Sequence, residues 1–194
     1  MTMRAIKFST AVVGLFAYAC CAFAQQSVGR FDGEVVAKFM RDGRNMQVEQ
    51  TFAYIDPAGR RWEVPAGTIT DGASVPQGFW VCCPPFSGKY RSAAVVHDYY
   101  CQTKSRSWKE THLTFYNAMR ASGVTESQAK AMYGAVYSFG PRWGTGLRGV
   151  KTGAPVAEQQ KVFADLESWI ERENPSLEEI GRRLDDGKLP VQGR

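Results

Sequence analysis

Histidine is scarce in this chain. Only His97 and His112 occur among 194 residues, and both lie within one 16-residue stretch. No His-Glu-x-x-His motif is present, so the helix typical of zinc proteases is excluded. Hydrophobic residues make up 44% and charged residues 22% of the chain, which excludes wholesale disorder and collagen-like or coiled-coil repeats. The length suits one domain with appendages.

Long hydrophobic runs are also lacking after the first two dozen residues, so we expect no transmembrane segment in the mature chain. The start of the chain is positively charged, residues 8–19 are almost continuously apolar, and an Ala-x-Ala end follows at 22–24. This order is typical of a secretory signal peptide, here residues 1–24. A lipoprotein cleavage before Cys20 is the alternative. We therefore expect export to the periplasm or secretion.

Excess charge is small. The expected cleavage removes two basic residues and no acidic ones, which lowers the formal net charge from +5 to +3. The remaining basic residues are scattered, so we expect no nucleic-acid partner. A component of the cell envelope is the partner class that export favours.

Cysteines become few once the signal peptide is removed. Three remain, Cys82, Cys83 and Cys101. In an oxidising compartment one disulfide is expected, from Cys101 to either Cys82 or Cys83.

Strand-like segments come first and helices follow. Turn signals separate three segments rich in β-branched and aromatic residues, and N-cap and glycine stop signals delimit the helices. The sequence therefore predicts an α+β fold, a small antiparallel β-meander followed by a helical bundle of three core helices plus C-terminal helices. We expect one domain over 25–143, then a Gly-rich connector and a helical extension over 144–194. The expected strands are 33–40, 46–55 and 61–69; the expected core helices are 92–102, 108 to about 122 and 126 to about 139.

The two histidines fall on adjacent predicted helices. His112 lies on one stripe with Trp108 and Phe115, so it faces the core. The linker between the helices is short and polar, which favours an antiparallel pair that brings His97 and His112 within contact distance. Asp98 lies about 100° further around its helix, toward an adjacent groove.

Three chemistries suit this cluster. His97 is a candidate general base, with His112 or an acid orienting its ring. Alternatively, His97 and His112 hold a metal together with Asp98 or Asp71, zinc being the natural choice for nitrogen ligands. The third is a nucleophile from Ser74 or a cysteine. The cofactor is thus a divalent metal, zinc or calcium, or none.

A loop between sheet and helices adds further candidates. Asp71 and Ser74 lie in Thr-Asp-Gly-Ala-Ser-Val-Pro, either as a simple Asx turn or at the rim of the histidine site. Trp80 and Tyr100 are aromatic candidates for substrate binding, although packing is the commoner role of such rings.

Four segments together resemble a known family. They are VPAGTITDGASVP (64–76), GKY (88–90), AAVVHDYY (93–100) and THLTFYNAM (111–119). Their order is similar to that of the domain-of-unknown-function 1353 family of bacterial and phage proteins, over about residues 33–143. That family's usual second-helix pattern is Ala-Asp-x-x-Phe, whereas this chain has Thr111-His112. The resemblance implies a domain and candidate positions but no reaction.

The His-Asp pair also resembles the arrangement of secreted phospholipase A2. By that analogy His97 is the base, Asp98 a calcium ligand and His112 the orienting residue. The Gly-rich calcium loop of that family is absent here.

Two functions follow from these patterns. The first is a hydrolase that acts on an envelope lipid or peptidoglycan component, with water activated by His97 or a bound metal. The second is a non-enzymatic envelope binding or accessory protein, in which the motifs specify the fold.

Overall fold

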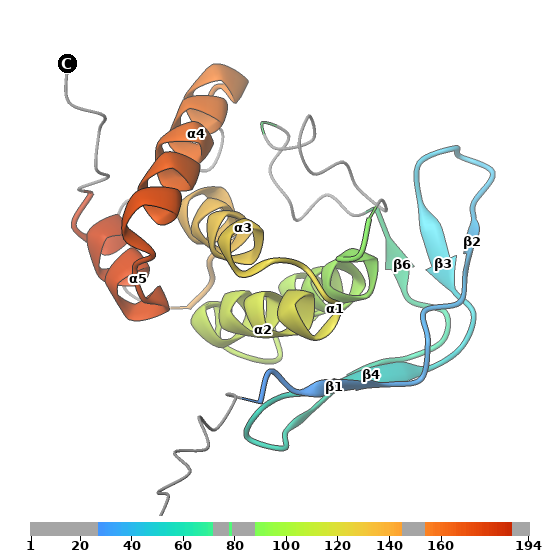
Figure 1. Cartoon of the computed structure of the whole chain (residues 1–194). Coiled ribbons are helices and arrows are strands. Elements are labelled where there is room, and N and C mark those ends of the chain that lie inside the picture. The colour runs from blue at the N-terminus through green and yellow to red at the C-terminus, as the bar shows by residue number, and fades with distance from the viewer. Residues whose placement is uncertain (1–26, 72–77, 79–87, 145–153, 188–194) are drawn as a thin grey trace, which may run out of the picture.

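A computed structural model describes residues 27–71, 78, 88–144 and 154–187 (Figure 1). Within these residues, six short strands precede five helices. The arrangement confirms the α+β class predicted from the sequence. The expected signal peptide lies outside the described residues, so export stays a prediction.

The strands form two small antiparallel sheets, ordered β1-β4-β5 and β2-β3-β6. The segment 46–55, expected as one strand, is split because exposed polar residues at 49–51 separate β3 from β4. Each half then pairs with different neighbours, so the chain turns from one sheet into the other. The strands are β1 (Arg30–Asp32), β2 (Ala37–Phe39), β3 (Met46–Val48), β4 (Phe52–Ile55), β5 (Arg61–Val64) and β6 (Ile69–Thr70).

Three of the five described helices begin at a side-chain cap, whereas the first and the fourth do not. Ser107 and Glu110 form the expected capping box at the start of the second helix, and Thr125 and Ser176 accept backbone N–H groups at the starts of two others. The helices are α1 (Arg91–Thr103), α2 (Trp108–Ala121), α3 (Glu126–Phe139), α4 (Val156–Glu173) and α5 (Leu177–Asp185).

The helices pack in sequence order, α1 on α2 and α2 on α3, and α3 also contacts α4 and α5 (Figure 1). The C-terminal helices therefore dock on the core. Gly134 of α3 permits close approach, since a Cβ there would lie 2.9 Å from a methyl of Leu166 on α4. Val156, in the first turn of α4, is exposed. The buried α4 residues are Phe163, Leu166, Trp169 and Ile170.

Trp62 joins the sheet of β5 to α1. Its side chain is fully buried, and its ring meets the ring of Tyr100 edge-on with centroids 4.7 Å apart. The indole N–H donates to a carboxylate oxygen of Asp56 at 3.1 Å, as a buried tryptophan requires. The guanidinium of Arg106 lies over the same ring.

In the part of the chain that the structure describes, we find no helix both long enough and apolar enough to cross a membrane.

We predict that Trp62→Ala destabilises the fold by about 3–5 kcal/mol, because it removes a large buried ring and leaves a cavity. Trp62→Phe should cost less, because a buried aromatic ring still packs on Tyr100, while the bond to Asp56 and part of the ring volume are lost. Urea unfolding measures both changes. An equal loss of unfolding free energy in the two variants would contradict the packing role of the Trp62 ring.

Candidate functional site

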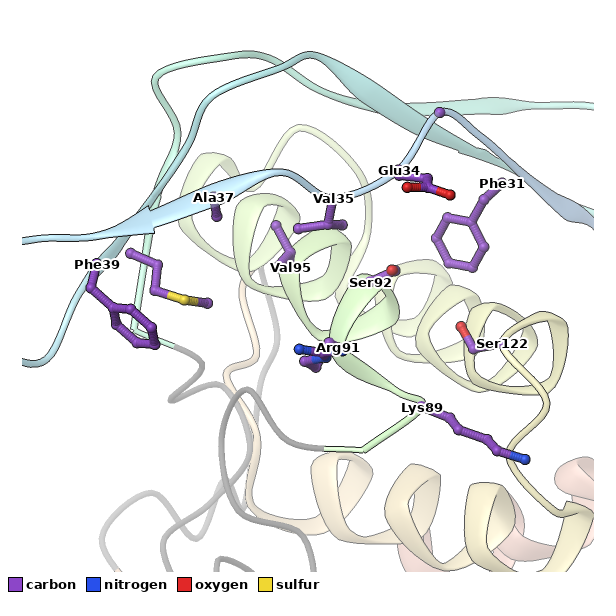
Figure 2. A pocket seen from close by; sticks show the side chains of 12 residues that line it. Phe31, Glu34, Val35, Ala37, Phe39, Lys89, Arg91, Ser92, Val95 and Ser122 are labelled. Atoms are coloured by element: carbon purple, nitrogen blue, oxygen red, sulfur yellow. The ribbon is translucent and has the colours of Figure 1, made fainter.

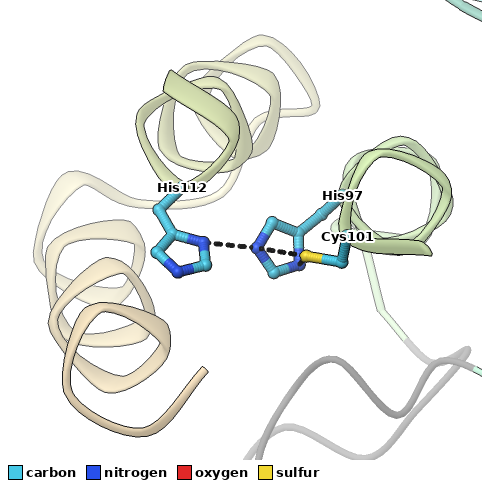
Figure 3. A group of neighbouring side chains, drawn as sticks. All are labelled: His97, Cys101 and His112. Atoms are coloured by element: carbon cyan, nitrogen blue, oxygen red, sulfur yellow. Dashed lines mark hydrogen bonds between the residues drawn. The ribbon is translucent and has the colours of Figure 1, made fainter. Parts of the chain in front are cut away.

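His97 and His112 meet at the interface of α1 and α2 (Figure 3). The left-handed backbone of Lys104 (φ 53°) ends α1, and Ser107 already caps α2, so the chain reverses within a few residues. His97 Nε2 and His112 Nδ1 lie 2.8 Å apart, within hydrogen-bond distance. This contact confirms the juxtaposition predicted from the helical stripes.

Cys101 lies one turn after His97 and completes a cluster. Its Sγ is 3.6 Å from His97 Nε2. Ligand atoms from Cys101, His97 and His112 all lie within 4.8 Å of one another. All three side chains are buried, with exposed fractions of 6%, 1% and 0% respectively.

Aromatic rings surround the two histidines. The ring of His97 stacks on Phe115 at a centroid distance of 4.7 Å, and Trp108 meets His112 edge-on at 5.5 Å. These apolar neighbours replace water, so a charged imidazolium there would lose its hydration.

Burial lowers the pKa of His97 to about 3. Burial also lowers the pKa of His112 well below its usual value, and the charges of His97 and Arg142 lower it further. The backbone carbonyl of Pro141 acts in the opposite direction. Both rings are therefore neutral at pH 7, which is the form that binds metal ions.

The second nitrogen of His112, Nε2, is also buried. Among the described residues it meets no group in full hydrogen-bond geometry, although the backbone carbonyl of Pro141 interacts with the ring closely enough to raise its pKa. A metal between the two rings would bind His97 Nε2 and His112 Nδ1 and leave protons on the outer nitrogens.

The distances can be compared with those of a tetrahedral zinc site. Typical Zn–N and Zn–S bonds place two nitrogens about 3.4 Å apart and a nitrogen and sulfur about 3.6 Å apart. The distance from Cys101 Sγ to His97 Nε2 already has the latter value. The two nitrogens, at 2.8 Å, would separate by about half an ångström on binding.

Other predicted site residues lie elsewhere. Asp98 is buried, but its carboxylate accepts a hydrogen bond from Thr70 Oγ1 of β6 at 2.5 Å. Asp71 pairs with Arg44 at 3.0 Å near the surface. Neither aspartate belongs to the cluster of three converging ligand atoms.

Tyr100, predicted to bind substrate, packs on Trp62, and its hydroxyl donates to the backbone carbonyl of Glu63 at 3.4 Å. The remaining candidates fall outside the described residues, so their roles and the disulfide of Cys101 stay predictions. They are Ser74, Trp80, Cys82 and Cys83.

For Cys101 the sequence favoured a disulfide over a metal-ligand pair with His97. Its spacing of four residues from His97 was a usable signal, because positions i and i+4 share one helix face. The expected disulfide competed with that assignment. A thiolate that binds a metal cannot at the same time form a disulfide.

The described chain is thus an α+β domain with a buried His-Cys-His cluster between two adjacent helices. Residues 46–136 match the model of the family described as "Protein of unknown function (DUF1353)". The match confirms the resemblance seen in the sequence and includes all three cluster residues.

Two curated relatives come from Sinorhizobium fredii (strain NBRC 101917 / NGR234). "Uncharacterized protein y4jT" is 46% identical over 125 residues, which cover 63% of this chain and 37% of the relative. "Uncharacterized protein y4iH" is 42% identical over 118 residues, which cover 58% of this chain and 48% of the relative. The chain therefore spans less than half the length of either relative. No solved structure matches it significantly.

The neutral state of the two buried histidines predicts how the stability of the fold depends on pH. In the unfolded chain each histidine takes up a proton below pH 6.5, whereas in the folded state the pKa of each is lower. Stability of the metal-free protein should therefore fall as pH decreases from about 6.5, by up to about 1.4 kcal/mol per pH unit for each histidine. Urea unfolding at pH 7, 6 and 5 with a chelator measures this slope.

The double variant His97→Gln/His112→Asn is the matched control. Its amides replace Nε2 of His97 and Nδ1 of His112 by groups that do not titrate. Between pH 6.5 and 5, the unfolding free energy of this variant should change less with pH than that of the unmodified protein, because both titrating rings are gone. An unchanged slope would contradict the neutral, buried state of the pair.

Proposed function

We propose that this protein is a zinc-dependent hydrolase in which His97, Cys101 and His112 hold the ion. The supporting observation is the convergence of their three ligand atoms within 4.8 Å. Three protein ligands leave one position of a tetrahedral zinc ion for water, as in catalytic zinc sites. Zinc held by these three residues would act as a Lewis acid that activates water for attack at neutral pH.

The ligand chemistry favours zinc over calcium. Calcium takes six to eight oxygen ligands, whereas this cluster offers two imidazole nitrogens and one sulfur. Imidazole and thiolate together suit zinc. Binding would remove the thiol proton of Cys101, because a coordinating thiol is deprotonated.

The proposed substrate is an ester or amide bond in an envelope component, either lipid or peptidoglycan. The expected signal peptide supports this assignment, because it would deliver the protein to the compartment that holds such substrates.

A second candidate function is favoured by the burial of the cluster. Both histidine rings are almost completely inaccessible, and structural zinc sites are closed to solvent. In this alternative the ion joins α1 to α2, and the protein is a non-enzymatic binding or accessory protein of the envelope.

Metal content tests the site common to both functions. Elemental analysis of zinc-reconstituted, dialysed protein should find about one zinc per chain. His97→Ala, Cys101→Ala and His112→Ala should each lose it, since each removes one ligand. Met119→Leu, a volume-conserving change at another buried position of α2, should retain it.

Cobalt titration of the unmodified protein keeps the test independent of variant folding. A tetrahedral cobalt spectrum with a thiolate charge-transfer band is expected in reduced protein. Protein without stoichiometric zinc and without that band would overturn the metal site.

Hydrolysis distinguishes the two functions. Zinc-loaded and zinc-free protein are compared on p-nitrophenyl acyl esters, phospholipid vesicles and purified peptidoglycan. Zinc-dependent cleavage of one of these probes, lost in Cys101→Ala, is the expected result. Zinc that raises the melting temperature without cleavage of any probe would favour the accessory protein instead.

A further inference from the structure

A pocket of about 550 Å³ lies beside the first half of α1, between this helix and the segment that contains β1 and β2 (Figure 2). Its size falls within the range of small-molecule sites. Val95 lines it, and Val95 lies about 200° around α1 from His97. The pocket is therefore separate from the His-Cys-His cluster.

One wall of the pocket is apolar. Phe31, Val35 and Phe39 contribute from the strand segment, and Val95 from the helix. In Figure 2 the side chains of Val35 and Val95 lie beside one another, with Phe39 further along the strand segment. Phe39 is 75% exposed, the highest value among the large hydrophobic residues that the structure describes. Its exposed ring extends the apolar wall outward.

The opposite side of the pocket is basic. Lys89 and Arg91 lie there, close to the start of α1 (Figure 2), and both are exposed. Within the described residues, neither forms an ion pair, and the only bond of Lys89 is a 3.5 Å contact to the carbonyl of Gly123. Their charges are thus available to a ligand.

One acidic residue also lines the pocket. Glu34 lies on the rim formed by the strand segment, and in the described part of the chain it pairs with neither Lys89 nor Arg91. Two cations against one carboxylate give the lining a net positive charge. The basic end can therefore accept one anionic group, and Glu34 disfavours a second anion on its own side.

We propose that this pocket binds a single-chain anionic amphiphile, with its phosphate or carboxylate on Lys89 and Arg91 and its acyl chain along the apolar wall. The division of the lining into a basic end and an apolar wall supports this occupant. A guanidinium binds phosphate or carboxylate through paired N–H groups, while the rings and Val95 remove the chain from water.

Isothermal titration of the full protein tests this proposal. The probes are dodecyl phosphate below its micelle concentration, a neutral dodecyl glucoside, and inorganic phosphate. Dodecyl phosphate should bind one to one, and at least tenfold more tightly than either other probe. Binding should weaken as salt is raised, because the charged end is exposed.

Variants locate the site. Lys89→Gln/Arg91→Gln should weaken dodecyl phosphate at least tenfold and leave the neutral probe unchanged, whereas Phe39→Ser should weaken both amphiphiles. These side chains are exposed, so the fold should tolerate the changes. Lys161→Gln on α4, an exposed cation outside the pocket, is the matched control and should bind as the unmodified protein does.

Three results would overturn the proposal. They are equal affinity for the anionic and neutral probes, unaltered binding by the Lys89/Arg91 variant, and attachment to anionic vesicles without binding of monomeric dodecyl phosphate. The last result would indicate a surface attraction to membranes instead of a ligand pocket.

Discussion

The contact between His97 and His112 is the constraint on which the site depends. Two neutral imidazoles share one hydrogen bond in apolar surroundings, and separating them would remove this bond from two buried nitrogens. The contact therefore holds α1 and α2 at a defined distance. It also places Cys101, one turn along α1, beside the same nitrogen. The proposed zinc site uses these three ligand atoms, which lie within 4.8 Å of one another.

The adjacent residues His97 and Asp98 connect α1 to two different parts of the fold. His97 faces α2, whereas Asp98 accepts a hydrogen bond from Thr70 at the end of β6. Trp62 adds a second link from the sheets to this helix through Tyr100. α1 is thus fixed from both sides, which explains how a short helix can present a precise cluster on one face and line a pocket on another.

Much of this arrangement was predictable because it rests on local patterns. The capping box of Ser107 and Glu110 marks the start of α2, and the helical stripe of Trp108, His112 and Phe115 indicates its buried face. A short linker then leaves few ways to pack α1 on α2, so the histidine contact could be predicted. Less predictable was the choice between Asp98 and Cys101 as the third member, because both positions are compatible with a helix that packs on two sides.

The sequence by itself determined the α+β class, the places of the core helices and the meeting of the two histidines, because capping and periodicity act over a few residues. Tertiary structure decided the division of the strands into two sheets, the pairing of Asp98 with Thr70, and the pocket between α1 and the strand segment. Each of these depends on contacts between residues far apart in the chain. Such contacts are set by the packing of whole elements, which local spacing does not specify.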